Sequence, residues 1–256
     1  MGGDSKTAIV TGSSRSVGRA TALALAERGY AVAINYSTSH REAEAVVQEI
    51  QVLGGRAISV QADVSDNDSC KHLVDCTVER LGRLDALINN AGTTSFIPHN
   101  ALDQITDEDW DRIMGVNLKG PFQMVRAALP ALTENGGGCV VNVASIAGLS
   151  ATGSSIPYCA SKAALLNMTV ALARVCAPEV RVNAVAPGFI EGAWLKQGLG
   201  NAYDMVKKQC EERSPLHKVC QPEDVSDAIM ALVEGSQLVT GQTVVVDGGM
   251  LIGSTP

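Results

Sequence analysis

The sequence contains few aromatic residues: only 4% of its 256 residues are Phe, Trp or Tyr. A chain of this length still buries a substantial core, and 46% of its residues are hydrophobic. The core must therefore be built from Ala, Val, Leu and Ile, which suits helices packed closely on a buried parallel sheet. Because α/β folds of this length often form one domain, we expect a single domain over residues 1–256.

Basic runs, paired cysteines and long apolar segments are also missing. The net charge is −7 and Lys and Arg form no run, which argues against a nucleic-acid-binding surface. The seven cysteines contain no Cys-x-x-Cys pair and the four histidines no His-Glu-x-x-His, so we expect buried free thiols and no metal site. No apolar run approaches the length of a membrane span, and the first twelve residues lack a signal-peptide stretch. We therefore expect a cytoplasmic protein without membrane association.

Short apolar or β-branched runs alternate with longer segments of helical periodicity, which include residues 20–27, 41–53 and 68–81. Runs that are apolar on nearly every residue predict burial on both faces, and hence parallel strands with helices on each side. The sequence therefore predicts an α/β protein with a doubly wound Rossmann fold and a seven-stranded parallel sheet. The predicted strands are residues 7–10, 31–34, 57–60, 86–88, 140–143, 180–185 and 243–246.

Residues 189–215 break this alternation. Several glycines interrupt the segment, and Trp194 and Leu195 give it apolar character. Two interpretations stay open at this point: a surface lid over a ligand site, or a disordered insertion.

A glycine-containing turn follows the first predicted strand and opens a helix, in the stretch 11–18 with the sequence Thr-Gly-Ser-Ser-Arg-Ser-Val-Gly. At this place in an α/β fold, backbone N–H groups and a helix N-terminus face an anion, and small residues let it approach closely. The turn therefore predicts a dinucleotide pyrophosphate site, with cofactor contacts from Gly12, Ser14, Arg15, Ser16, Val17 and Gly18.

The end of the second predicted strand indicates which dinucleotide binds. NAD-binding sites usually carry an Asp or Glu there, which hydrogen-bonds the ribose 2′-hydroxyl. No acid occurs here before Glu42, and Arg15 supplies a cation that can bind a 2′-phosphate through its forked, permanently charged guanidinium. We therefore predict NADP(H) in preference to NAD(H), the alternative being that Arg15 is a solvated turn residue. Hydroxyl side chains fill the window instead: Tyr36, Ser37, Thr38 and Ser39.

Tyr158 and Lys162 are spaced i, i+4, which places a phenol and an ammonium on one helical face. An unperturbed tyrosine has a pKa of about 10, and a nearby cation lowers that pKa by stabilising the phenolate. The pair therefore suits general acid–base catalysis. Ser145 ends the fifth predicted strand at the carboxyl edge of the sheet, where its hydroxyl can donate to a substrate carbonyl. Asn117 lies inside a predicted helix, where its side chain either faces solvent or serves a site.

Taken in order, these motifs resemble the short-chain dehydrogenase/reductase family over essentially the full length of the chain. Within that family, the chain looks closest to the 3-oxoacyl-carrier-protein-reductase-like members. The matching pieces are residues 11–18, Asp63-Val64, residues 89–92, Asn117, Ser145, Tyr158 with Lys162, residues 183–188 and residues 246–249.

The resemblance implies a role for each matched residue. Tyr158 would protonate the carbonyl oxygen as nicotinamide delivers hydride, and Lys162 would bind the nicotinamide ribose and lower the Tyr158 pKa. Ser145 would orient the carbonyl, and Asn117 would support a water that relays protons through Lys162. The remaining cofactor contacts would be Asp63 and Val64 beside the adenine, Asn90, Ala91 and Gly92 along the cofactor path, and Pro187, Gly188 and Ile190 beside the nicotinamide.

Two positions depart from the family pattern. A glycine is common where Ser16 stands in the phosphate turn, and serine lacks the freedom of glycine at positive φ. We expect cofactor binding to survive this change in weakened form. A threonine that holds the nicotinamide amide is common where Gly192 stands, so that hydroxyl is missing here.

These features predict an oxidoreductase that transfers a hydride between NADP(H) and a carbonyl or secondary alcohol substrate. One alternative is a 3-oxoacyl-thioester (acyl-carrier-protein) reductase, for which Lys119 and Arg126 are candidate contacts to the acidic carrier. Another is a non-catalytic NADP(H)-binding sensor, which has no need for four intact catalytic residues.

The substrate and the oligomeric state depend on separate features of the sequence. Trp194 fits either of two roles: packing on a cyclic or bulky carbonyl substrate, or packing on its own protein. The family resemblance also implies a homotetramer, with the last strand and its Gly248-Gly249 tail near an interface.

Overall fold

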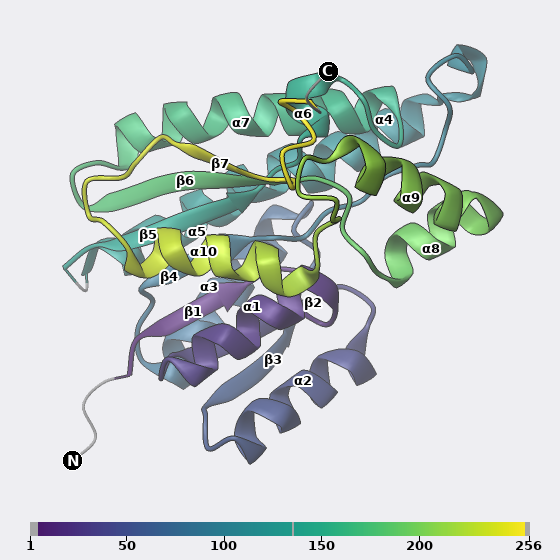
Figure 1. Ribbon diagram of the computed structural model, residues 1–256. Helices are drawn as coiled ribbons and strands as arrows, with labels where there is room; N and C mark the ends of the chain where they lie inside the picture. The colour runs from purple at the N-terminus through teal and green to yellow at the C-terminus, as the bar shows by residue number, and fades with distance from the viewer. Residues whose placement is uncertain (1–4, 135, 254–256) are drawn as a thin grey trace.

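The computed structural model describes residues 5–134 and 136–253. Residues 1–4, which belong to the segment that we expected to lack a signal peptide, lie outside the described residues. Seven parallel strands form one sheet in the order β3-β2-β1-β4-β5-β6-β7 (Figure 1), which confirms the predicted single-domain Rossmann-like fold. The strands are β1 (Thr7–Val10), β2 (Ala31–Tyr36), β3 (Ala57–Gln61), β4 (Ala86–Asn89), β5 (Gly138–Val143), β6 (Val180–Pro187) and β7 (Thr243–Val246).

The inner strands are apolar because helices cover both faces of the sheet. Every residue of β1, β2, β4 and β6 is buried, and their small or β-branched side chains allow the helices to approach closely. β7 differs because it is the edge strand, and Val244 and Val245 remain 38% and 41% exposed.

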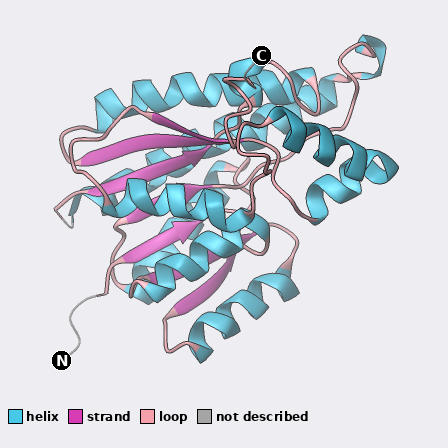
Figure 2. Cartoon of the chain, viewed as in Figure 1, coloured by secondary structure: helices cyan, strands magenta, loops and turns pink. Residues whose placement is uncertain are grey.

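Two layers of helices enclose the sheet (Figure 2). One layer holds α1 (Ser16–Glu27), α2 (His40–Val52) and α10 (Pro222–Glu234), which share one core cluster. The other holds α3 (Asn67–Leu81), α5 (Gly120–Glu134) and α7 (Ile156–Cys176), whose buried side chains form a second cluster. The shorter elements are the 3-10 turn Leu102–Gln104, α4 (Asp107–Met114), the π-helical segment Gly115–Lys119 and α6 (Ala147–Ser150).

Within residues 5–134 and 136–253, α7 alone is long and apolar enough to cross a membrane by length and composition. The expectation that no apolar run reaches such a length is therefore wrong by this measure. In the structure, α7 packs against β6 and α6, and its side chains Leu165, Leu166 and Leu172 are buried inside the fold. A helix that packs on the core of its own protein can share such an apolar composition with a membrane span.

Residues 189–215 form helices rather than an irregular or disordered stretch. The segment contains α8 (Ala193–Leu199), a 3-10 turn at Gly200–Ala202 and α9 (Tyr203–Arg213), and it lies beyond the carboxyl ends of the strands (Figure 1). Lys207 forms an ion pair with Glu191 at 2.9 Å, and the Ser214 hydroxyl donates to the Gly248 carbonyl at 2.6 Å. The first contact ties α9 to the start of the segment, and the second ties the end of the segment to the C-terminal tail.

Candidate active site

The turn between β1 and α1 is fixed by side chains from two other strands. Near the end of β2, Asn35 accepts a hydrogen bond on Oδ1 from the Gly12 backbone N–H at 3.1 Å. Just beyond β4, Asn90 donates its side-chain amide to the carbonyls of Thr11 and Gly12 at 2.8 and 3.0 Å. These contacts preorganise the turn for a ligand.

The N-terminus of α1 is open to an anion. Arg15, at the N-cap, makes no side-chain capping bond, and the first turn contains no acidic residue, so the backbone N–H groups there face outward with the positive end of the helix dipole. A Cβ on Gly18 would lie 2.5 Å from the Asn90 amide nitrogen, and one on Gly12 would lie 3.0 Å from the Ala91 Cα. The close-packed, uncapped turn fits a dinucleotide pyrophosphate.

The two departures from the family pattern meet next to this turn. Ser16 has a φ of +48°, a left-handed conformation that costs a non-glycine residue about 1–2 kcal/mol. Its side chain is exposed, whereas Ser14 and Val17 beside it are buried. A Cβ added to Gly192 would lie 4.0 Å from the Ser16 Oγ, so these positions are neighbours in space.

The loop after β2 presents hydroxyl groups to the phosphate turn. Arg15 donates to the Ser39 Oγ at 3.1 Å, which holds the guanidinium against this loop. Tyr36 is buried, and its hydroxyl is hydrogen-bonded to Nδ1 of His40 at 2.8 Å. The Tyr36 hydroxyl therefore already has a partner within the protein, while the guanidinium remains exposed.

Most other predicted cofactor residues lie along the carboxyl edge of the sheet. Asp63 is exposed, and its Oδ1 accepts from the backbone N–H and the hydroxyl of Ser65 at 2.9 and 2.7 Å. Val64 and Pro187 are buried beneath this edge. The predicted contacts that remain partly or fully exposed are Ser37, Thr38, Asn90, Ala91, Gly92, Gly188 and Ile190.

Tyr158 lies in the first turn of α7, which begins after a Ser155 cap that accepts from the Tyr158 backbone N–H. The Ser145 hydroxyl, just beyond β5, lies beside the Tyr158 phenol. Burial raises the pKa of that phenol to about 12, and the interaction with Ser145 opposes the rise. The Ala147 backbone N–H donates to the Ser145 Oγ at 3.1 Å, which orients the hydroxyl. Two hydroxyl donors therefore meet at one place, as a carbonyl oxygen requires.

Lys162 is buried below Tyr158. Its Nζ donates to the Val143 carbonyl at 2.8 Å and lies 5.8 Å from the centroid of the Tyr158 ring. Burial lowers the pKa of Lys162 to about 8. Burial disfavours the charged form of both groups, and it dominates the net upward shift of the Tyr158 pKa. Gly92 has no side chain, which leaves space beside Asn117 and Lys162. A Cβ at position 92 would lie 3.6 Å from the Asn117 Oδ1 and 3.8 Å from the Lys162 Nζ.

Asn117 stands in the π-helical segment rather than in a regular helix. Pro121 accounts for the break, because it has no N–H to donate to the Asn117 carbonyl four residues earlier. The Asn117 side chain is buried, and its amide donates to the Thr93 carbonyl at 2.9 Å and to the Ser161 hydroxyl at 3.0 Å. Its Oδ1 accepts from the Thr93 backbone N–H at 2.8 Å. The side chain therefore faces the interior beside Lys162 and not solvent.

Four residues that position the site were not singled out from the sequence: Thr11, Asn35, Thr93 and Ser161. The Thr11 hydroxyl accepts from the backbone N–H groups of Asn90 and Ala91 at 2.9 and 3.0 Å, and Ser161 donates to the Tyr158 carbonyl at 2.8 Å. Each is a small polar residue adjacent to a predicted site residue or strand end. Their position in the sequence was the only signal, because most of their hydrogen-bond partners lie in distant parts of the chain.

Two further aromatic side chains border the phenol, and we call the set Phe96, Tyr158 and Trp194 the aromatic corner. The Trp194 ring lies 5.9 Å from the Phe96 ring in an edge-on arrangement and 6.5 Å from the Tyr158 ring. Trp194, in α8, packs on its own protein yet remains 44% exposed. The corner therefore joins α8 to the loop after β4 beside Tyr158.

The cysteines resemble small hydrophobic residues more than nucleophiles. Burial raises the pKa of Cys70, Cys139 and Cys220 to about 11. Cys159 has a basic neighbour that its sequence context did not reveal, since its Sγ lies 3.9 Å from the His99 Nε2, but burial raises its pKa as well. In the part of the chain that the structure describes, no three His, Cys, Asp or Glu residues gather in a way that could hold a metal ion.

Known proteins share both the sequence and the fold. A family model described as Enoyl-(Acyl carrier protein) reductase matches residues 12–251. The 3-oxoacyl-(acyl-carrier-protein) reductase FabG of Staphylococcus aureus is 38% identical over 96% of this chain and 98% of its own length. The protein named "Granaticin polyketide synthase putative ketoacyl reductase 2" of Streptomyces violaceoruber is 42% identical over 96% of both chains.

A solved structure, titled "a putative short-chain dehydrogenase/reductase from Burkholderia xenovorans", matches with a TM-score of 0.90 and 39% identity, covering 98% of this chain and 100% of the other. The chain belongs to the short-chain dehydrogenase/reductase family. The resemblance drawn from the motifs is thereby confirmed, as is its similarity to 3-oxoacyl reductases. A short-chain dehydrogenase/reductase is an oxidoreductase that works with a nicotinamide cofactor, and the uncapped α1 turn suits that group.

Proposed function

We propose that this short-chain dehydrogenase/reductase reduces a carbonyl substrate to a secondary alcohol with NADPH, and runs the reverse oxidation with NADP⁺. The observation that carries the proposal is the meeting of the Tyr158 phenol and the Ser145 hydroxyl at the edge of the sheet. Lys162 and Asn117 are buried directly behind them. A protein that only binds a dinucleotide has no physical need for this set, which argues against a non-catalytic sensor.

Bound NADPH supplies the hydride for the carbonyl carbon. Ser145 donates a hydrogen bond to the carbonyl oxygen and orients it. Tyr158 gives its proton to that oxygen as negative charge develops, and its raised pKa keeps the phenol protonated at neutral pH until then. Lys162, in its ammonium form, stabilises the phenolate that remains. A proton then returns to Tyr158 through the space beside Asn117 and Gly92, so that ketone, hydride and proton together yield the alcohol.

NADP(H) is the proposed cofactor because Arg15 lies against the loop that follows β2. Its guanidinium donates to Ser39 and has further donors for a phosphate. Residues 35–41 contain no carboxylate that could bind a ribose 2′-hydroxyl. The cofactor contacts proposed from the sequence, including Asp63 at the adenine and Ile190 at the nicotinamide, complete this site.

Replacing Tyr158 with Phe tests the proposed chemistry. We expect Tyr158→Phe to lower kcat for ketone reduction about 10³-fold, because it removes a general acid while leaving the ring in place. The Kd for NADPH, measured by cofactor fluorescence, should change less than about twofold. Turnover at the wild-type rate in this variant would show that Tyr158 is not the proton donor.

Replacing Arg15 with Ala tests the cofactor preference. Hydrogen bonds to a charged group contribute about 1.5–3 kcal/mol, so the Kd for NADPH should rise about 10- to 100-fold while that for NADH stays nearly constant. Arg28→Ala, at the other end of α1, is the matched control. A wild-type preference for NADH, or equal weakening of both cofactors in Arg15→Ala, would contradict the assignment.

A second candidate function is the reduction of a 3-oxoacyl thioester, which the names of the relatives favour. Lys119 and Arg126 remain the candidate carrier contacts, although Arg126 is already bonded to Asn67 and lies 5.3 Å from the Phe122 ring. Rates of NADPH oxidation with an acetoacetyl thioester and with simple ketones separate the two functions. A kcat/KM at least about tenfold higher for the thioester would favour this second candidate.

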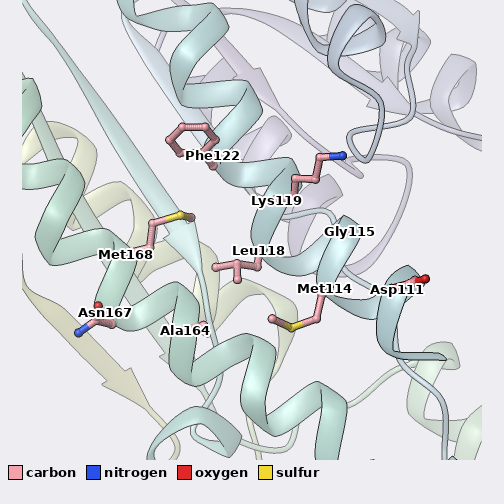
Figure 3. A pocket seen from close by; sticks show the side chains of 9 residues that line it. All are labelled: Asp111, Met114, Gly115, Leu118, Lys119, Phe122, Ala164, Asn167 and Met168. Atoms are coloured by element: carbon pink, nitrogen blue, oxygen red, sulfur yellow. The ribbon is translucent and has the colours of Figure 1, made fainter. Parts of the chain in front are cut away.

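We also propose a cytoplasmic homotetramer in which the α8–α9 segment acts as a substrate lid. A mainly apolar groove of about 700 Å³ lies between α7 and the stretch that runs from α4 to the start of α5. Leu118 and Met168 face each other across it, with Phe122 at one end (Figure 3). This groove and the exposed edge of β7 are separate apolar surfaces, which is what two different subunit contacts require.

A further inference from the structure

We infer that the aromatic corner selects ketones carried on, or fused to, a flat ring. The inference rests on the proposed function and names the substrate class for it. The chain has nine aromatic residues, and three of them meet at this corner: the proposed proton donor Tyr158, Trp194 beside it, and Phe96. A sequence so poor in aromatics therefore concentrates them at the place where substrate must bind.

Phe96 forms a fixed wall of the corner. A Cβ on Gly198 would lie 2.0 Å from the Phe96 Cε2, so the Phe96 ring rests directly against the backbone of α8. The residues on either side of Phe96 are anchored as well. Ser95 accepts from the Arg112 guanidinium at 2.7 Å, and the Ile97 backbone N–H donates to the Ser154 carbonyl at 2.9 Å. A ring that enters the corner therefore meets a preformed wall.

The nearby charged side chains are occupied elsewhere. Lys196 lies over the Tyr203 ring at 5.4 Å, and Lys207 is paired with Glu191. The corner thus presents the exposed indole of Trp194 and the partly exposed phenyl ring of Phe96. Such a surface favours a flat apolar ring, which stacks or packs edge-on and loses little conformational freedom. A flexible acyl chain makes less contact and loses more rotamer entropy.

Substrate selectivity tests the inference directly. With saturating NADPH, the wild-type protein should show a higher kcat/KM for 2-tetralone than for 2-decanone, a linear ketone with the same number of carbons. Trp194→Ala should lower kcat/KM for 2-tetralone about tenfold, corresponding to the loss of one well-placed aromatic contact. The value for 2-decanone should stay within about twofold, and Trp194→Phe should restore most of the preference. Trp110→Ala, which removes the other tryptophan, is the matched control.

A binding measurement keeps the inference testable apart from turnover. In the double variant Trp110→Phe, Tyr158→Phe, Trp194 is the sole tryptophan and the proton donor is missing. Its fluorescence should be quenched by 2-tetralone at concentrations where 2-decanone has no effect. Trp194→Phe, which retains Trp110, corrects for absorption by the ligand.

The outcomes separate the two proposals. If no ketone is reduced but 2-tetralone quenches Trp194, the proposed function fails and the ring-binding corner stands. If ketones are reduced with equal kcat/KM for ring and chain, and 2-tetralone does not quench Trp194, the inference is overturned while the reductase function stands.

Discussion

At the scale of single residues, burial controls the ionisation of the two central groups. Both Tyr158 and Lys162 are shifted toward their neutral forms, the phenol to a pKa of about 12 and the ammonium to a pKa of about 8. The spacing of Tyr158 and Lys162 predicted their adjacency but not these directions. Desolvation depends on the strands and helices packed around them, and those lie far away in the sequence.

The lowered pKa of Lys162 predicts a titration within reach of physiological pH. In ¹³C-lysine-labelled protein without cofactor, the NMR signal that disappears in Lys162→Arg should titrate with a midpoint of about 8. Lys162 is positively charged below this pH and neutral above it. Its electrostatic stabilisation of the Tyr158 phenolate therefore weakens as pH rises. A midpoint near the ordinary lysine value of about 10.4 would show that burial does not control this group.

At the scale of elements, the start of α1 combines a binding site with a strained residue. Ser16 occupies a left-handed conformation that favours glycine, on the first turn of a helix whose N-terminus is uncapped. Ser16 stands where glycine is common in the family, and its φ of +48° explains why glycine is favoured at this position. Strain retained at such a position points to a role for the serine side chain in ligand binding.

Comparing two substitutions at Ser16 measures the strain. Ser16→Gly should be more stable than Ser16→Ala by about 0.5–1 kcal/mol in urea unfolding. Both variants lose the hydroxyl, but only glycine relaxes at positive φ, and its greater freedom in the unfolded chain offsets part of the gain. Equal stability, or a more stable alanine variant, would mean that the turn carries no such strain. The Kd for NADPH of Ser16→Ala against wild type then isolates the contribution of the hydroxyl.

Two other elements show the limits of periodicity. The apolar pattern predicted all seven strands within a few residues, because buried parallel strands leave a strong local signal. It did not reveal the π-helical segment around Asn117, whose cause is the missing N–H of Pro121. It also did not reveal that residues 189–215 are helical, because their contacts to Phe96 and to the C-terminal tail come from elsewhere in the chain.

At the scale of the whole molecule, the proposed homotetramer requires two self-complementary surfaces. The groove around Phe122 is one candidate, and the exposed residues of β7 form the other. In analytical ultracentrifugation, the wild-type protein should sediment at four times the mass of the chain. Phe122→Glu should reduce this to a dimer held by the β7 surface, because it places a charge within an apolar contact.

The matched control for this substitution is Val52→Glu, at a highly exposed position on α2 outside both surfaces. It should leave the tetramer intact. A wild-type monomer, or a tetramer that survives Phe122→Glu, would remove the groove from consideration as a subunit contact.

The sequence by itself determined the doubly wound fold, the order of the strands along the chain and the family, because apolar periodicity and motif order are local properties of the chain. The tertiary structure decided the burial and the contacts of the residues in the site. It buried Tyr158 and Lys162, turned Asn117 toward Thr93, and joined Phe96 to Trp194 beside the phenol. Those features depend on desolvation and on contacts between residues that are distant in sequence, and a linear pattern does not record them.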